Sequence, residues 1–242
     1  MDRSSRREDV TINIKSMHKI KYHLLIIILA CSIMACSKMD DTYKDFVQGG
    51  EIVYTGRVDS LRVFPGRNRI KLSWLLISDS KITRCKVFWN DGADMKEVPV
   101  QRSTGTDTIT VMLSNMPERT YTFDVYTYDN DGHSSVKEDT IGVVYGDVYA
   151  GSLFNRPLKT ITFSADTARL EWAGASAQSV SVQLNYTDIS NTPRTVVVPR
   201  LETMTKLPKF KKGDSFQYRT LYLPERNAID TFYTVYESKQ VL

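Results

Sequence analysis

The sequence has few of the side chains that enzymes use for nucleophilic catalysis or for binding a metal. Its 242 residues include three cysteines and three histidines, and beyond residue 36 only Cys85 and His133 remain. A nucleophile needs a base within hydrogen-bond reach, and a structural zinc site needs four Cys or His ligands. A glycine-rich phosphate-binding loop is also absent from the sequence. We therefore expect a protein that is not an enzyme and that has no cofactor and no metal site.

One short segment comes close to a metal-binding motif. Asp129-Asn130-Asp131-Gly132 has the acidic spacing of a calcium loop but lacks the glutamate that would follow it. Asn, Asp and Gly are also the residues that tolerate the backbone conformations of tight turns. We expect a hairpin turn here, with His133 as a solvated loop residue beside it.

A strong excess of charge is absent as well. The net charge is +4 at pH 7, and the first 35 residues contribute six basic and three acidic side chains to it. The remaining chain has 26 basic and 25 acidic residues and is close to neutral. A near-neutral chain lacks the electrostatic footprint of a nucleic acid-binding protein. We expect no nucleic acid partner.

The sequence contains a single long apolar run, close to its N-terminus. Lys19 and Lys21 precede the apolar residues 24–30, and the segment ends at Cys36. A dozen apolar residues are too few to span a bilayer comfortably, but they are typical of a secretory signal peptide. We predict a signal peptide over residues 1–35, with Met17 as a possible true start. A buried core helix and an uncleaved membrane anchor are the alternatives.

The end of this segment resembles the lipobox of bacterial lipoproteins, because the small residue Ala35 directly precedes Cys36. The resemblance implies that the sulfur of Cys36 is acylated and that Cys36 becomes the mature N-terminus. Cys31 is a weaker rival, since cleavage there would leave apolar residues in the tether. Residues 36–50 are then a lipidated tether. Several acyl chains anchor a protein stably to a membrane.

The tether carries an acidic pair, Asp40-Asp41, soon after the predicted lipidation site. Such pairs resemble the surface-export signal of lipoproteins in glycan-foraging gut bacteria. The resemblance implies an outer-membrane lipoprotein on the cell surface.

The rest of the sequence predicts strands and no convincing amphipathic helix. Apolar residues alternate with polar ones between turn signals at a spacing of roughly 8–12 residues, which is typical of a β-sandwich. In the first half we predict strands at 57–64, 68–76, 82–89, 95–100, 108–113, 121–129 and 135–144. Cys85 alternates with Val87 and is expected to be a small core residue. The fold class is all-β, with two tandem immunoglobulin-like sandwiches at 51–147 and 148–242 and a linker at 146–151.

The segment from Leu113 to Tyr121 contains the most specific fold signal. A leucine ends one strand, Pro117 turns the chain and Tyr121 opens the next strand. This pattern resembles the tyrosine corner of fibronectin type III domains, in which the tyrosine hydroxyl bonds to the backbone upstream. The resemblance implies a fibronectin-like module in which Tyr121 bonds to backbone between Leu113 and Arg119. Trp74 is expected to lie between its two sheets.

The second half repeats this scheme more loosely. Residues 169–172, which end in Trp172, are similar to residues 71–74. A further alternating stripe is predicted to face the core, and it consists of Val180, Val182, Leu184 and Tyr186. Phe216 occupies the position expected for the corner tyrosine and has no hydroxyl group. The second module is therefore expected to be more divergent.

Strand parity also predicts a candidate binding patch in the first sandwich. If Val87 and Val125 face the core, then Phe88, Tyr126 and Tyr128 face outward. The two strands are neighbours in a fibronectin-like sheet. An exposed aromatic patch marks an interaction site, and flat rings suit the faces of sugars. Coverage of the patch by the second domain or the tether is the alternative.

The mature chain resembles an uncharacterised group of two-domain surface lipoproteins that are found beside glycan-uptake systems. The resemblance is strongest at Tyr43, Phe46, residues 49–51, Tyr54 and Trp74. It implies a non-enzymatic surface protein that binds or presents a glycan or a partner protein, in association with an outer-membrane transporter. A structural spacer or assembly subunit is the first alternative, and a hydrolase is the second.

Overall fold

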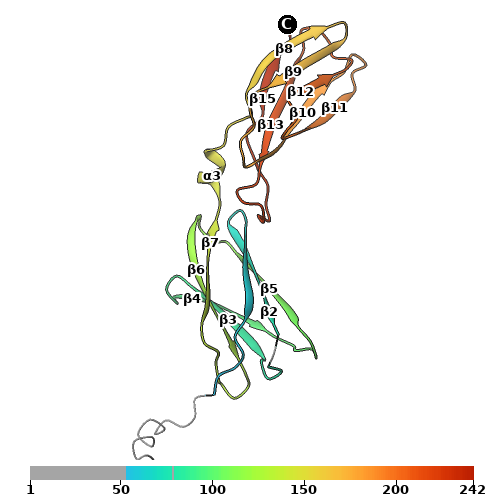
Figure 1. The fold of residues 1–242 in the computed structure, drawn as a ribbon. Coiled ribbons are helices and arrows are strands. Elements are labelled where there is room, and N and C mark those ends of the chain that lie inside the picture. The colour runs from blue at the N-terminus through green and yellow to red at the C-terminus, as the bar shows by residue number, and fades with distance from the viewer. Residues whose placement is uncertain (1–52, 78) are drawn as a thin grey trace, which may run out of the picture. The chain divides into compact units, whose positions relative to one another are not determined.

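The computed structural model describes residues 53–77 and 79–242 (Figure 1). The predicted signal peptide, the lipidation site Cys36 and the tether at 36–50 lie outside the described residues. The described chain is all-β apart from one short helix, and its strands form fibronectin-like sandwiches, as predicted. No helix in this part of the chain has the length and apolar character needed to cross a membrane.

The first sandwich consists of seven antiparallel strands. They are β1 Asp59–Pro65, β2 Arg69–Leu76, β3 Arg84–Trp89, β4 Asp94–Pro99, β5 Asp107–Ser114, β6 Arg119–Tyr128 and β7 Glu138–Val144. One sheet has the order β1-β2-β5 and the other has the order β4-β3-β6-β7. Each strand lies within a few residues of its predicted position, because alternation and turn residues specify this half of the chain clearly.

The core of the first sandwich follows the predicted alternation. Ile70, Leu72 and Trp74 of β2 are fully buried, and they face Val87 and Phe123 of the other sheet within one cluster. Cys85 is also fully buried and has no disulfide partner among the described residues. Burial raises the pKa of the Cys85 thiol to about 11, so the thiol stays protonated at neutral pH. Cys85 is thus the core residue that the sequence predicts.

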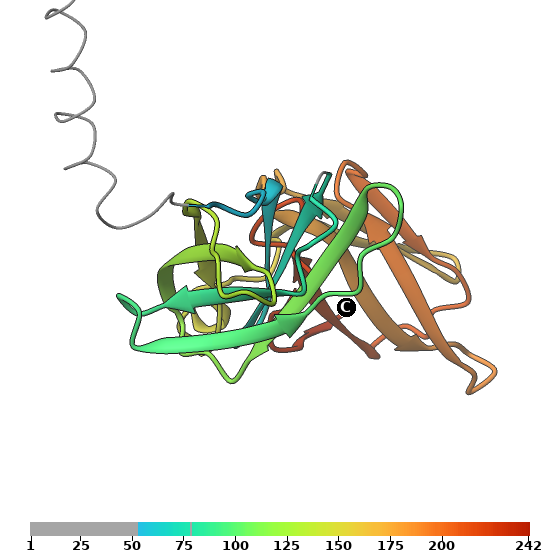
Figure 2. The ribbon, with the colours of Figure 1, turned by 90° about the horizontal axis from the view of Figure 1, so that it is seen from below.

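The second sandwich repeats this strand order (Figure 2, orange to red). Its strands are β8 Leu158–Ser164, β9 Thr167–Trp172, β10 Ser179–Thr187, β11 Pro193–Pro199, β12 Met204–Leu207, β13 Ser215–Tyr222, β14 Phe232–Tyr233 and β15 Glu237–Gln240. One sheet has the order β12-β9-β8. In the other, β10 lies between β11 and β13, and both β14 and β15 pair with β13. The last strand is therefore divided into two short pieces.

The prediction that Val180 faces the core is wrong. Its side chain is 42% exposed, whereas Val182, Leu184 and Tyr186 are buried as predicted. The pairing of β10 with β13 shifts between Ser179 and Ser181. An extra residue in a strand reverses the direction of the side chains beyond it. The small polar side chains of Ser179 and Ser181 are buried instead.

The predicted tyrosine corner is present in the first sandwich. Tyr121 is 4% exposed, and its hydroxyl donates to the carbonyl oxygen of Pro117 at 3.0 Å. In the second sandwich Phe216 is buried and has no hydroxyl to donate. There the hydroxyl of Tyr186 on β10 donates to the carbonyl oxygen of Pro208 at 3.0 Å. The loop before β13 is thus held by a tyrosine from a neighbouring strand.

The segment between β7 and β8 contains the helical turn α3, Asp147–Gly151, which the sequence analysis did not predict. Both oxygens of the Glu118 carboxylate accept backbone N–H groups, from Val148 and Tyr149, at 2.8 Å. A carboxylate at this position satisfies free N–H groups of the first turn. A five-residue helix has no periodic signal, so alternation could not reveal it.

Candidate functional site

The outer surface of β3 and β6 is the candidate site, and strand pairing determines its composition. Val87 lies opposite Val125, and both side chains are fully buried. Phe88 and Tyr126 are the next residues along each strand and therefore face outward. Their ring centroids are 5.9 Å apart with an edge-on geometry of 84°. The prediction that these two rings share the outer face and touch is confirmed.

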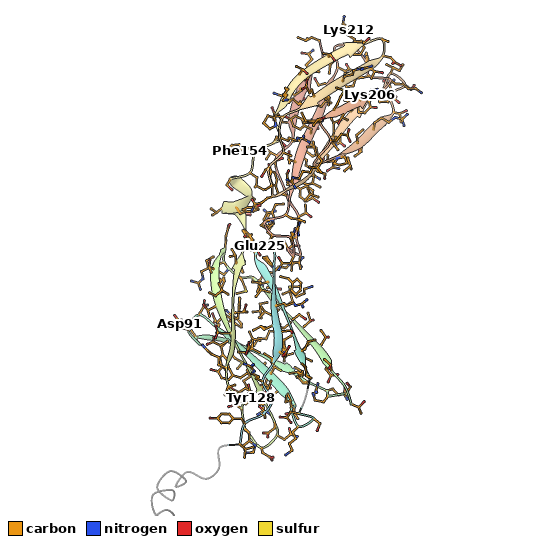
Figure 3. The ribbon with its side chains drawn as sticks, in the orientation of Figure 1. Asp91, Tyr128, Phe154, Lys206, Lys212 and Glu225 are labelled. Carbon is orange, nitrogen blue, oxygen red and sulfur yellow. The ribbon has the colours of Figure 1, made fainter. Side chains whose placement is uncertain are left out.

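Tyr128 lies on the same face at the end of β6 (Figure 3). It pairs with Arg84, and the Arg84 guanidinium carbon lies 5.6 Å from its ring centroid. The ammonium nitrogen of Lys86 is 5.0 Å from the same centroid. Cations at these distances are attracted to the ring face. Burial raises the pKa of the Tyr128 hydroxyl, as does the nearby Tyr126 hydroxyl, while Arg84 opposes the shift.

We call Phe88, Tyr126 and Tyr128, together with Arg84 and Lys86, the aromatic face. Its three rings are half-buried. Arg84 and Lys86 are not among the residues predicted for the site from the sequence. Both lie at alternate positions with Phe88 on β3, so their side chains point to the same face of the sheet. The alternation that identified the rings could therefore have identified these cations too.

Charges of both signs surround the aromatic face. Lys86 lies 3.5 Å from Glu97, and Lys137 lies 3.4 Å from Asp124 and 3.6 Å from Asp139. The hydrogen bond to Asp124 raises the pKa of the Lys137 ammonium. A mixed-charge rim around aromatic side chains is typical of a protein interface.

The Asp129–Gly132 segment forms a turn that His133 completes. The backbone N–H of His133 donates to one Asp129 oxygen at 2.9 Å, and its ring Nδ1 lies 2.7 Å from the other. Asp129, Asp131 and His133 offer three possible metal ligands within 4.8 Å of one another. Both Asp129 oxygens already have partners within the turn. The predicted hairpin turn therefore accounts for these contacts.

Two solved structures illustrate the similarity to fibronectin type III domains. One is a two-domain fibronectin type III segment from chicken tenascin, which is 16% identical. The match covers 77% of this chain and 99% of the tenascin segment, with a TM-score of 0.32. The other comprises the FN1–FN3 domains of chicken CNTN1, which are 13% identical. The match covers 79% of this chain and 67% of the CNTN1 chain, with a TM-score of 0.40. No curated protein matches the sequence.

A family match covers most of the sequence, including the whole of the predicted tether at 36–50. Residues 36–232 match DUF4998, which is described as a domain of unknown function. This range includes the aromatic face and nearly all strands of both sandwiches. The chain therefore belongs to the DUF4998 family.

Proposed function

We propose that this chain is a non-enzymatic lipoprotein of the outer membrane and that it binds a partner at the cell surface through the aromatic face. A fibronectin-like fold supports a binding or structural role. The observation that carries the proposal is the grouping of Phe88, Tyr126 and Tyr128 on one outer sheet face. The lipid anchor at Cys36 and a setting beside a glycan-uptake transporter rest on sequence resemblance.

The surroundings of the rings favour a protein partner over a sugar at this face. Two cations, Arg84 and Lys86, lie over the single Tyr128 ring and crowd the space in which a sugar would stack. Phe88 and Tyr126 contact one another edge-on and do not form a flat platform. Aromatic side chains and arginine are enriched at protein interfaces, where a polar rim surrounds them. A component of the uptake machinery is the partner we propose.

Site-specific photo-crosslinking in the native cells tests this proposal. A photoreactive phenylalanine analogue replaces Tyr126 in the full-length chain, and a matched control replaces Thr122, an exposed residue on the same strand and face. We expect an adduct of one defined size from position 126, and a much weaker one from position 122. Adding Lys86→Ala and Phe88→Ala should remove the adduct without loss of surface expression. The absence of any adduct at position 126 would contradict the proposal.

The lipid anchor has its own test. Cys36→Ser should leave an unprocessed precursor that incorporates no acyl label, because acylation needs the cysteine sulfur. Cys31→Ser is the matched control and should be processed normally. Normal processing of the Cys36→Ser chain would move the anchor to Cys31.

A structural spacer is the second candidate function, and contacts between the two sandwiches favour it. The Arg69 guanidinium donates to both Asp230 oxygens at 2.8 and 2.5 Å, and the Arg67 N–H donates to Asp230 at 2.8 Å. The N–H of Ile229 also donates to the Pro65 carbonyl at 2.8 Å. A bidentate arginine–carboxylate pair restricts the geometry of the groups that it joins. A stalk needs such contacts, whereas a flexible tether does not.

A further inference from the structure

The outer face of the second sandwich carries a row of neutral polar side chains. Asn185 on β10 pairs with Thr195 of β11 on one side and with Gln217 of β13 on the other. Gln217 in turn pairs with Ser238 of β15. The row therefore crosses four strands, and each member can donate and accept hydrogen bonds. The Thr195 hydroxyl donates to the Asn185 side-chain oxygen at 2.9 Å, which fixes the amide orientation.

This row forms the floor of a shallow depression of about 510 Å³. Most of its lining is neutral and polar: Gln183, Asn185, Thr195, Ser215, Gln217 and Ser238. Among the described residues, no carboxylate lines it. Arg194 lies at its border, and its guanidinium is already bonded to Asp188 at 2.8 Å. The surface is thus rich in hydrogen-bonding groups and poor in free charge.

Two tyrosines, Tyr233 and Tyr236, lie on the same outer face as this depression without lining it, and Arg219 is held against both. The Arg219 guanidinium carbon lies 4.2 Å from the ring centroid of Tyr233 and 4.8 Å from that of Tyr236. Arg219 Nε donates to Gln183 at 2.8 Å, and the Asn185 amide donates to the Tyr236 hydroxyl at 3.1 Å. The tyrosines are still 43% and 41% exposed. The rings are therefore positioned in advance and remain accessible.

A break in the last strand brings the two tyrosines to the same side. Leu221 pairs with Tyr233 of β14, whereas Tyr218 pairs with Glu237 of β15. The register thus shifts by one residue between β14 and β15, as in a β-bulge. In a regular strand, residues 233 and 236 would point to opposite faces. The shift places both rings beside Arg219.

We propose that this face binds a neutral oligosaccharide built from pyranose rings. Such a ligand presents neighbouring hydroxyls, which side-chain amides can bond as donor and acceptor at once. It also presents apolar C–H faces, which pack against tyrosine rings. The lack of carboxylates in the described lining disfavours a cationic ligand, and the pairing of Arg194 with Asp188 disfavours an anionic one. This site lies on a different sandwich from the aromatic face, so either proposal can fail alone.

Affinity electrophoresis of the full-length protein in detergent tests the inference. The gels contain one of three neutral polysaccharides (galactomannan, xyloglucan or mixed-linkage β-glucan) or the anionic polygalacturonate. We expect at least one neutral gel to retard the protein, and polygalacturonate not to do so. Asn185→Ala and Gln217→Ala should each weaken binding about tenfold, the effect of losing one well-placed polar contact. Thr162→Ala, an exposed residue of β8 in the opposite sheet, is the matched control.

The possible outcomes are distinct. Retardation that is lost in Asn185→Ala and kept in Thr162→Ala, with unchanged melting temperatures, supports the site. Retardation that is lost in Tyr126→Ala and kept in Asn185→Ala would overturn the inference and place the sugar on the aromatic face. Migration unchanged in all three neutral gels, or slowed only by polygalacturonate, would also overturn it. None of these results depends on the photo-crosslinking of position 126.

Discussion

The two sandwiches share a strand order but differ in the outer face of the corresponding sheet. In the first sandwich this face carries aromatic rings among paired charges, such as Lys86 with Glu97. In the second, neutral side chains such as Asn185 and Gln217 occupy it, and Tyr233 and Tyr236 lie on the same face around Arg219. The fold constrains the inward residues and leaves the outward residues free to differ. The two faces are thus suited to ligands of different chemistry.

The cores of the two sandwiches each bury a tryptophan, but they differ in the hydrogen bonding of its indole N–H. Trp74 and Trp172 are both 1% exposed, as the sequence predicts. The Trp172 indole N–H donates to Thr205 at 3.0 Å, whereas the Trp74 indole N–H has no oxygen or nitrogen acceptor among the described residues and meets only the weakly accepting thiol of Cys85. An unpaired buried donor lowers stability. The second core therefore has a strong polar contact at its tryptophan that the first core lacks.

The largest expected effect comes from truncating these tryptophans. Trp74→Ala and Trp172→Ala should each lower the free energy of unfolding by about 3–5 kcal/mol, because each leaves a large cavity. Trp172→Ala also removes one of two hydrogen bonds of the Thr205 hydroxyl, which keeps its bond to Glu202 at 3.0 Å, so the cavity should dominate the cost. Guanidinium denaturation followed by fluorescence measures both. A cost below about 1 kcal/mol for either would show that the indole does not support its core.

The stability contributions of the two corner hydroxyl groups, of Tyr121 and Tyr186, can be compared directly. Tyr121→Phe and Tyr186→Phe each remove one hydroxyl that donates to a proline carbonyl. Each change should cost about 0.5–1.5 kcal/mol, the contribution of one hydrogen bond. Equal losses would show that a tyrosine from β10 substitutes fully for the usual corner. An unchanged denaturation midpoint for Tyr186→Phe would show that the second corner contributes nothing.

The contact between the sandwiches should be broken by a single methyl group. A Cβ atom at Gly66 would lie 2.6 Å from an Asp230 oxygen and 2.8 Å from an Ile229 carbon, both closer than atoms can pack. Gly66→Ala should therefore accelerate protease cleavage in the segment between β7 and β8. Gly105→Ala is the matched control, because beyond its chain neighbours no atom of the described residues lies within 4 Å of its Cβ position. Equal cleavage rates in both variants would argue against a stalk.

The same contact should depend on pH. The hydrogen bond from Arg69 holds the pKa of the Asp230 carboxyl below its usual value. A depressed carboxyl pKa stabilises the contact above the ordinary carboxyl pKa, and this stabilisation is lost as the pH falls through the depressed value. Arg69 is partly exposed, so the effect should be below about 1 kcal/mol. At acidic pH, the rate at which a protease cleaves the wild type between β7 and β8 should approach the rate for Gly66→Ala. An acid-active protease measures both rates.

The smallest expected effect on stability is at the two outer faces. Tyr126→Ala and Asn185→Ala should each change the free energy of unfolding by about 0.5 kcal/mol or less, as is usual for surface positions. Their effects should instead appear in binding, and separately for the two proposed ligands. A large loss of stability with unchanged binding would show that the face in question is only structural.

The sequence determined the features that depend on local alternation. Seven strands of the first sandwich, the buried tryptophans and the Tyr121 corner follow from residue parity and turn chemistry. The placement of Phe88 beside Tyr126 follows in the same way, because both flank buried valines. Parity holds wherever a strand is regular, and β3 and β6 are regular throughout their pairing.

Only the tertiary structure decided the features that depend on register between strands. A shift in β10 exposes Val180, and a second shift brings Tyr233 and Tyr236 to one side of Arg219. Arg69 and Asp230 are 161 residues apart, and no local pattern links them. A bulge changes the sheet face to which the following side chains point. Its position depends on where the pairing with the partner strand leaves a residue unpaired. Alternation within one strand contains no information about that partner, so these contacts exist only once the sheets have formed.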